Sequence, residues 1–220
     1  MGQSLSVRWF TKFCGILGIT GLAGSASAAR LEIARLFAPP DLSGPTLRAP
    51  QFSPDGRYLA YLKGRPDNKD RLDLWAFDIR AHRHVRLVDS ASLAPQPAVL
   101  AAEEAQRRER QRLSALSGII EYRFSPDSRY LLVPLEGDLY LYDLQAAPGA
   151  AVRRLTNTPA YETDARFSPK GHFVSYVREQ NLYVYDLAAH EERAITHGGG
   201  GPVSYGVAEF VAQEEMERYT

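Results

Sequence analysis

Cysteine is nearly absent from this sequence, and so is any excess of charge of one sign. The 220 residues contain one cysteine, Cys14, so an intramolecular disulfide and a four-cysteine zinc site are both excluded. The 26 Lys and Arg residues balance 26 Asp and Glu residues. A neutral chain has no overall field to attract nucleic acid or an anionic membrane, so we expect neither partner.

The sequence also lacks an apolar run long enough to cross a membrane. Its longest mostly apolar stretch, residues 13–23, is well short of the roughly 20 residues that a spanning helix needs. Basic residues precede it and the small residues Ala26, Ser27 and Ala28 follow it, which is the layout of a secretory signal. We therefore expect residues 1–28 to be a cleaved signal peptide of a periplasmic or secreted protein, rather than a membrane anchor.

Three stretches of the sequence repeat one order of features. They begin with QFSPDGRYLAYLKG, RFSPDSRYLLVPLEG and RFSPKGHFVSYVREQ, and continue with LDLWAFDI, DLYLYDL and NLYVYDL. Proline sets the backbone angle at the first corner of a turn, so each Ser-Pro pair and the small or polar residues after it predict a tight hairpin turn. The aromatic and β-branched residues that follow favour strands. Each repeat therefore predicts four short strands.

The spacing of these repeats favours a β-propeller. Phe124 and Phe167, at equivalent positions of the second and third repeats, are 43 residues apart, within the roughly 40 to 50 residues of a four-stranded blade. Phe52 precedes Phe124 by 72 residues, so the first interval carries 29 extra residues. We expect an all-β fold over residues 29–220: an incomplete propeller of about three four-stranded blades plus the start of another. A β-sandwich is the alternative, but sandwiches seldom repeat one turn three times.

The extra residues predict a helical arm. The segment AVLAAEEAQRRERQRLSAL has no glycine or proline and is rich in good helix formers, so we expect a helix over about residues 96–116. Glu104 and Arg108 have the i,i+4 spacing of a favourable helical ion pair. Because exposed charges usually contribute little, we expect much of the arm to be a solvated, charged helix.

Two adjacent carboxylates occur in the last segment, GVAEFVAQEEMERYT. On a strand, Glu214 and Glu215 would point to opposite faces, whereas a turn or short helix lets both approach one point. A carboxylate pair can satisfy the donors of an ammonium group. The alternative is a solvated acidic turn, since most carboxylates in proteins are exposed.

These two segments resemble parts of one protein family. GVAEFVAQEEMERYT is similar to the double-glutamate segment of dipeptidyl peptidase IV family serine peptidases, in the prolyl oligopeptidase clan. RERQRLSALSGIIEY resembles the family's arginine-bearing arm, most closely that of the bacterial relatives of dipeptidyl peptidases 8 and 9. The resemblance implies that Glu214 and Glu215 bind the free amino terminus of a peptide. It implies that Arg112 contacts the carbonyl of the second residue from the scissile bond.

The resemblance also implies what the whole protein does. It would release N-terminal dipeptides, with proline or alanine next to the cut, without a cofactor or a metal, and as a full-length homodimer. The family carries its Ser, Asp and His triad on a C-terminal α/β-hydrolase domain, so no catalytic residue is expected in this chain, which should be inactive alone. The alternative is a non-catalytic periplasmic propeller that binds protein or peptide.

Neither Ser204 nor the histidines offer a catalytic or metal site of their own. A nucleophile elbow needs glycines two residues on either side of its serine, but Pro202 occupies the first of these positions around Ser204. The histidines are expected in turns and strand ends, without the company of metal ligands. They are His82, His84, His172, His190 and His197.

Overall fold

The computed structural model describes residues 31–38, 42, 44, 46–96, 99–216 and 218. The chain divides into two compact units, Met1–Leu42 and Ser43–Thr220. The first contains one short helix, α1 (Ile33–Phe37), among its described residues. The expected signal peptide, including Cys14, lies outside the described residues. In the part of the chain that is described, no helix has the length and apolar character needed to cross a membrane.

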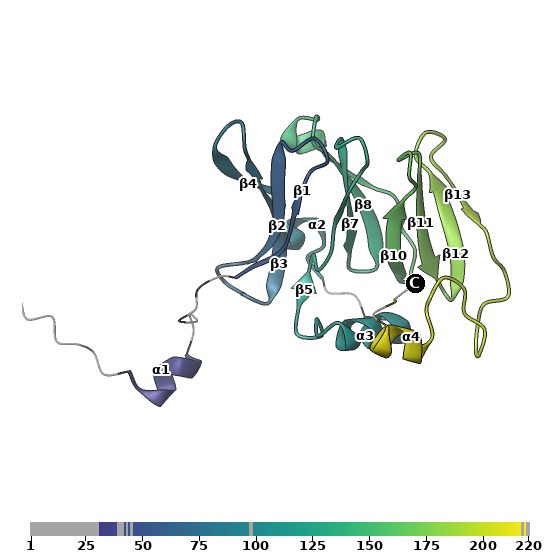
Figure 1. The fold of residues 1–220 in the computed structure, drawn as a ribbon, viewed down its shortest axis with the longest axis horizontal. Helices are drawn as coiled ribbons and strands as arrows, with labels where there is room; N and C mark the ends of the chain where they lie inside the picture. Colours follow the sequence, from purple (N-terminus) through teal and green to yellow (C-terminus); the bar gives the residue numbers. More distant parts are fainter. Residues whose placement is uncertain are drawn as a thin grey trace, which may run out of the picture. The chain divides into compact units, whose positions relative to one another are not determined.

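Three antiparallel sheets follow one another along the second unit (Figure 1). The first consists of β1 (Leu47–Phe52), β2 (Tyr58–Gly64), β3 (Arg71–Asp78) and β4 (Arg83–Val88). The second consists of β6 (Arg123–Phe124), β7 (Tyr130–Leu135), β8 (Asp138–Asp143) and β9 (Val152–Arg154). The third consists of β10 (Glu162–Phe167), β11 (Phe173–Arg178), β12 (Asn181–Asp186) and β13 (Glu191–Ala194).

This arrangement confirms the expected fold class. The strands of each sheet pair in chain order, and the sheets stand side by side as three propeller blades that do not close a ring (Figure 1). A two-residue strand that the repeat did not predict, β5 (Ser117–Gly118), pairs in parallel with β3. After β13, the described residues form an isolated bridge between Gly200 and Val203 and then helix α4 (Phe210–Glu215), rather than a further strand. The other helices are α2 (Ser90–Leu93), α3 (Ala102–Arg110) and a 3₁₀ turn at Pro148–Ala150.

The three Ser-Pro turns form as the sequence predicts. In each, a backbone N–H donates to the carbonyl of the serine three residues earlier, at 2.8 Å from Gly56, 3.0 Å from Ser128 and 2.8 Å from Gly171. All three residues have positive φ, of 69°, 60° and 74°. Ser128 adopts this conformation without being glycine, and its hydroxyl accepts a 2.9 Å hydrogen bond from the N–H of Asp55. The turns of the first two blades are thereby linked to each other.

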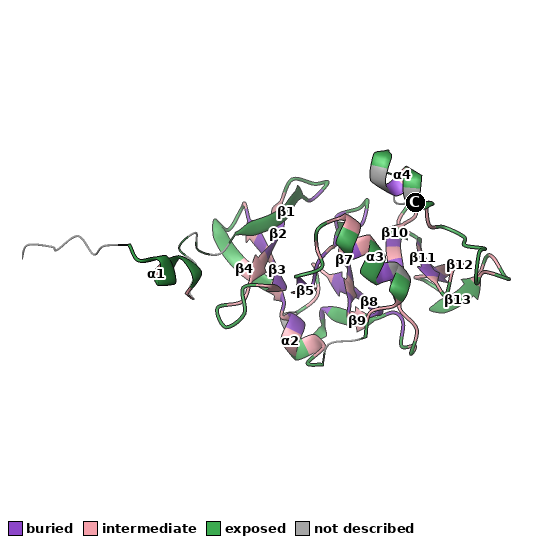
Figure 2. Ribbon diagram, turned by 90° about the horizontal axis from the view of Figure 1, so that it is seen from below, coloured by how far each residue is buried: buried purple, intermediate pink, exposed green. Residues whose placement is uncertain are grey.

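The core lies between neighbouring sheets (Figure 2). Strand β8 shows how this works, because both of its faces are buried. Tyr140 and Tyr142 pack into the cluster shared with the first sheet, whereas Leu139 and Leu141 pack into the cluster shared with the third. The alternation of aliphatic and aromatic residues in the sequence thus corresponds to two different packing interfaces.

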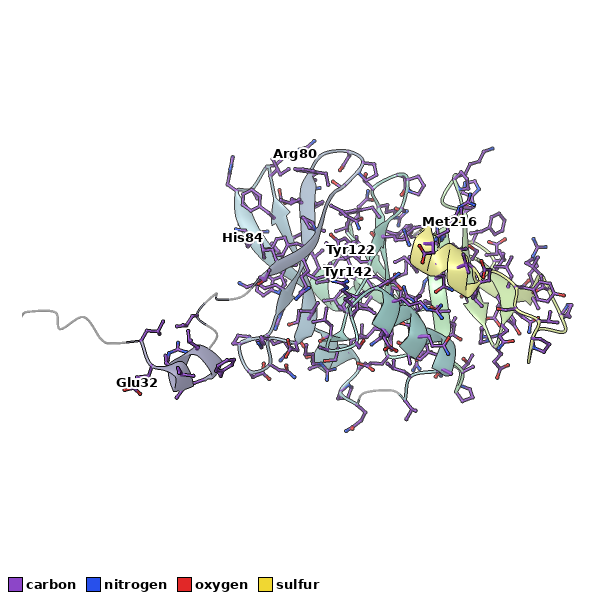
Figure 3. All side chains as sticks on the ribbon, turned by 60° about the horizontal axis from the view of Figure 1, so that its bottom comes forward. Glu32, Arg80, His84, Tyr122, Tyr142 and Met216 are labelled. Carbon is purple, nitrogen blue, oxygen red and sulfur yellow. The ribbon has the colours of Figure 1, made fainter. Side chains whose placement is uncertain are left out.

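A buried tyrosine ties the first two blades together. Tyr122, just before β6, is 2 % exposed and lies between the first two sheets with Tyr142 nearby (Figure 3). Its hydroxyl oxygen lies 2.6 Å from the carbonyl oxygen of Ala49 and 2.7 Å from that of Ala60, which share its single proton. These contacts join the chain that leaves the insertion to β1 and β2.

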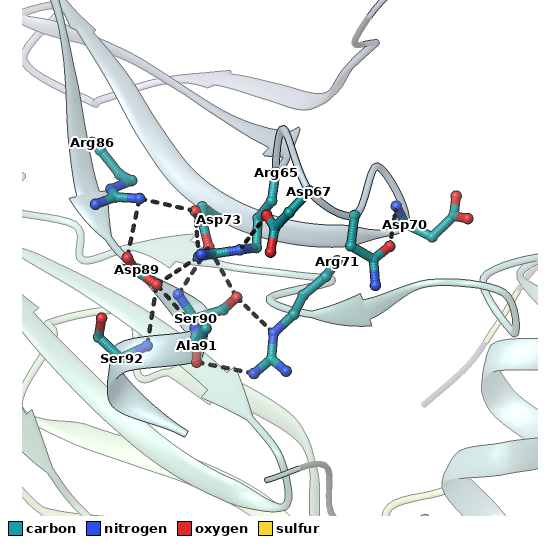
Figure 4. Close-up of polar contacts among 11 residues, drawn as sticks. Arg65, Asp67, Asp70, Arg71, Asp73, Arg86, Asp89, Ser90, Ala91 and Ser92 are labelled. Carbon is teal, nitrogen blue, oxygen red and sulfur yellow. Dashed lines mark hydrogen bonds and ion pairs between the residues drawn. The ribbon is translucent and has the colours of Figure 1, made fainter. Parts of the chain in front are cut away.

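The insertion begins at a fixed point on the first sheet (Figure 4). Asp89 caps α2 by accepting hydrogen bonds from two backbone N–H groups of its first turn. Asp73, buried on β3, accepts 2.9 Å hydrogen bonds from both the backbone N–H and the hydroxyl of Ser90. Arg65 joins the two carboxylates, with Nη1 2.7 Å from Asp89 and 3.2 Å from Asp73. Because Ser90 donates to Asp73 and Arg65 bridges Asp73 and Asp89, α2 is held against β3.

Candidate functional site

The arm contains a helix, but a shorter one than the 96–116 expected. Helix α3 runs only from Ala102 to Arg110. It ends in a Schellman motif, in which Leu113 N–H donates to the Arg108 carbonyl at 2.7 Å and Arg112 N–H donates to the Glu109 carbonyl at 2.9 Å. Arg112 occupies the left-handed position of this motif, with φ of 57°, where glycine is the usual residue. The backbone therefore turns away at Arg112 and stops the helix.

The helix of the arm buries two charged side chains, Glu104 and Arg108, on one side. The rest is largely solvated as expected, since Ala102, Ala105, Gln106 and Glu109 are exposed. Glu104 is 1 % exposed. The predicted pair with Arg108 forms at 2.7 Å, and Arg107 adds a second ion pair to the same carboxylate at 2.7 Å. The hydroxyl of Thr163, on β10, donates to Glu104 at 2.8 Å. Contact with the third sheet shields the Glu104 carboxylate from water. The two arginines and the Thr163 hydroxyl compensate for the lost hydration.

Arg107 and Arg108 extend these contacts to the rest of the propeller. Arg107 Nη2 lies 2.9 Å from a carboxylate oxygen of Glu121, and Arg108 Nη2 donates to the hydroxyl of Tyr161 at 2.5 Å. Burial alone would raise the pKa of Glu104, but the hydrogen bonds and positive charges of Arg107 and Arg108 outweigh it and lower that pKa. Glu104 is therefore ionised at neutral pH and fastens the arm to β10.

The double glutamate lies on the short helix α4, the arrangement in which both residues can approach one point. Glu209 caps the helix, since its carboxylate accepts hydrogen bonds of 3.0 Å and 2.9 Å from the N–H groups of Val211 and Ala212. Glu215, at the last position of the helix, is exposed. The structure describes the backbone of Glu214 but not its side chain.

The structure brings the arm and the double-glutamate helix together. Arg110 Nη1 donates to the side-chain oxygen of Gln213 at 2.5 Å, although the two residues are 103 positions apart. Gln213 directly precedes Glu214, and Arg110 lies two residues before Arg112. This side-chain contact links the end of α3 to α4, although the two helices stand apart when seen from below (Figure 2).

Arg112 is the arginine of RERQR with an uncommitted side chain. Arg108 and Arg110 hold Glu104 and Gln213, respectively. Arg112 is exposed and forms no hydrogen bond or ion pair with any residue that the structure describes. A ligand carbonyl or carboxylate could therefore bind its guanidinium without displacing an internal contact.

A cavity of about 640 Å³ lies beside the start of α3, but it is not where these residues meet. Its lining includes Leu100, Glu104, Tyr161, Thr163 and Val207. Arg112 and Glu215 do not line it. Of the polar residues that do, Glu104, Tyr161 and Thr163 are engaged with one another or with the arm arginines. Glu179 and Gln180 also line the cavity.

Ser204 and His84 both lie at the surface. Ser204 is exposed in the loop that follows the Gly200–Val203 bridge. His84, also exposed, shares a 2.7 Å hydrogen bond with the hydroxyl of Tyr61. No group of three or more metal-ligating side chains occurs in the described ranges.

Comparisons with known proteins place part of the chain. Residues 123–220 match the family model described as the dipeptidyl peptidase IV (DPP IV) N-terminal region. Among solved structures, dipeptidyl peptidase 4 of Porphyromonas gingivalis is similar at 18 % identity and a TM-score of 0.48, over 78 % of this chain and 22 % of that protein. TolB of Acinetobacter baumannii is similar at 18 % identity and a TM-score of 0.45, over 70 % of this chain and 33 % of that one. The chain thus spans about a third or less of the length of either protein.

Proposed function

We propose that this chain is the substrate-anchoring N-terminal part of a serine peptidase that releases dipeptides from peptide N-termini. The observation that carries the proposal is the junction of the arm with the double-glutamate helix through Arg110 and Gln213. The match of residues 123–220 to the dipeptidyl peptidase IV N-terminal region supports it independently. A non-catalytic scaffold propeller would not account for that match.

In this proposal, the site acts by fixing the position of a peptide's amino end. Glu214 and Glu215 bind the ammonium group, since two carboxylates can accept its hydrogen bonds and balance its charge. Arg112 donates to the carbonyl of the N-terminal residue, which is the second from the scissile bond. Anchoring both groups at a set distance from the nucleophile makes the third residue the leaving group and uses binding energy for positioning.

The reaction itself belongs to residues outside this chain. A serine on an α/β-hydrolase domain attacks the carbonyl of the second residue, the shortened peptide leaves as an amine, and water hydrolyses the acyl-enzyme to free the dipeptide. The 220 residues alone would hold a peptide without cleaving it. We further propose a preference for proline or alanine next to the cut, a full-length homodimer, and closest kinship with the bacterial relatives of dipeptidyl peptidases 8 and 9.

Replacing Arg112 with glycine should lower activity without lowering stability. In the full-length protein, Arg112→Gly should lower kcat/KM for glycyl-prolyl-p-nitroanilide by roughly 30- to 1000-fold, because a buried charge-assisted contact of about 2 to 4 kcal/mol is lost in the complex. The same change should not lower the melting temperature, since glycine suits the positive φ of this position better than arginine does. Steady-state kinetics and a thermal melt of the same preparation measure both.

Two results would count against this role for Arg112. A change in kcat/KM below about twofold would mean that Arg112 is only a solvated side chain on the arm. A loss of activity accompanied by a marked fall in melting temperature would assign it to stability instead.

Secretion can be tested on the chain itself. When the gene is expressed with its first 28 residues, N-terminal sequencing of the periplasmic or secreted product should begin at Ala29, because Ala26 and Ala28 are the small residues that signal peptidase accepts. Ala28→Phe should block this cleavage. A product that retains Met1 in the unaltered protein would rule out the signal peptide.

A further inference from the structure

We infer that Arg110 is a positioning residue that holds the double-glutamate helix in register with the arm. This inference rests on the proposed function, because it assigns how the carboxylates of that site are kept in place. It concerns a different arginine from Arg112, one with no expected contact to the peptide.

Gln213 is the point at which α4 docks. Among the side chains of α4 that the structure describes, those of Val211 and Glu215 are exposed and Gln213 is the buried one, at 5 % exposed (Figure 2). Its amide oxygen accepts from Arg110, and its amide nitrogen donates to the carbonyl of Ala208. A buried amide oxygen that loses its donor keeps the full cost of its desolvation. The burial of Gln213, and with it the docking of α4, therefore depends on Arg110.

The helix needs such a contact because it is short. Helix α4 has six residues, and isolated helices shorter than about 12 residues are marginal in water. The Glu209 cap and the bond from Gln213 to Ala208 are local, so they shape the helix without fixing its place on the propeller. Among the hydrogen bonds of α4 that the structure describes, the contact from Arg110 is the one that reaches a distant part of the chain, across 103 residues.

Arg110 is itself held in place from the other side. The helix that carries it is fastened to β10 by Glu104, which binds both Arg108 and the hydroxyl of Thr163. A continuous path of contacts therefore runs from the third sheet through Glu104 and α3 to Arg110, and from there to Gln213. Arg112 lies two residues after Arg110, and Glu214 directly follows Gln213. This path of contacts therefore sets the distance between Arg112 and the double glutamate.

The test compares Arg110→Met, which keeps the aliphatic stem but removes the donors, with Gln213→Leu and the double variant, in the full-length protein. With glycyl-prolyl-p-nitroanilide, Arg110→Met should raise KM about tenfold and change kcat less than about threefold, because the ammonium subsite is displaced while the reacting groups are untouched. The double variant should match the worse single variant, since both remove the Arg110–Gln213 hydrogen bond. Arg110→Lys should restore most of the affinity, and Arg193→Met, an exposed arginine of β13, should have no effect.

A second readout keeps this inference separate from the proposed function. Amide hydrogen exchange over residues 208–216, measured without substrate, should be faster in Arg110→Met and Gln213→Leu than in the unaltered protein or Arg193→Met. Unchanged exchange and unchanged KM in Arg110→Met, with a raised KM in Glu215→Gln, would overturn the positioning role alone. The positioning role would also be overturned if the increase in KM of the double variant equalled the product of the increases in the two single variants. Unchanged kinetics in Glu215→Gln, with faster exchange in Arg110→Met, would overturn the proposed function and leave the structural coupling standing.

Discussion

Replacing Glu214 and Glu215 together with alanine should abolish cleavage of dipeptide substrates that carry a free amine. In the proposed complex, these carboxylates replace the water around the peptide's ammonium group, and an unpaired charge in such a place is strongly disfavoured. We expect kcat/KM for glycyl-prolyl-p-nitroanilide to fall by at least about 1000-fold, equivalent to roughly 4 kcal/mol of lost transition-state stabilisation. Glu215 is exposed at the end of a short helix, so its own replacement should change the melting temperature little.

The controls for this double variant separate charge from position. Glu191→Ala, which removes an exposed carboxylate on β13, should leave kcat/KM unchanged. The N-acetylated substrate should be a poor substrate for the unaltered protein, because it lacks the positive charge that the carboxylates bind. An unchanged kcat/KM in the double variant would remove the assignment of both glutamates.

Replacing Glu104 with alanine should cost about 3 to 5 kcal/mol of the free energy of unfolding, the range for removing one partner of a buried ion pair. The substitution leaves Arg107 and Arg108 facing a buried space that has lost its carboxylate, and it removes the acceptor of the Thr163 hydroxyl. Urea unfolding followed by circular dichroism measures the loss. The matched control is Glu109→Ala on the same helix, where the side chain is exposed and the expected change is within about 0.5 kcal/mol.

The same carboxylate makes stability depend on pH. The pKa of Glu104 in the folded chain lies below its ordinary value of 4.5, so its contribution is fully present above pH 4.5 and is lost as the pH falls through the lowered folded value. The difference in stability between the unaltered chain and Glu104→Ala should therefore shrink on acidification below pH 4.5. Equal costs for Glu104→Ala and Glu109→Ala at neutral pH would show that the arm is not fastened through this residue.

The sequence predicted those parts of the fold that local chemistry determines. The Ser-Pro turns formed because proline and the small residues after it favour one turn geometry, even where Ser128 rather than glycine takes the positive φ. The two faces of β8 could be read from its alternating residues. The end of α3 could not be read in this way, because Arg112 gives no glycine signal for the Schellman motif that stops the helix.

The parts that the sequence did not predict depend on contacts between distant segments. Nothing near Glu104 indicates that its helix packs on β10, so its charges were expected in water. The hydrogen bond between Arg110 and Gln213 joins residues 103 positions apart, and neither residue belongs to a recognisable motif pair. Helix α4, by contrast, was among the alternatives favoured for Glu214 and Glu215, because only a turn or helix lets adjacent side chains reach one ligand.

The most direct test is a crystal structure of the full-length protein with a bound peptide that has a free amino terminus. We expect its ammonium nitrogen within about 2.7 to 3.2 Å of carboxylate oxygens of both Glu214 and Glu215, and the guanidinium of Arg112 on the carbonyl of the N-terminal residue. A peptide bound elsewhere, or an Arg112 side chain turned to solvent away from the two glutamates, would contradict the proposed anchoring site.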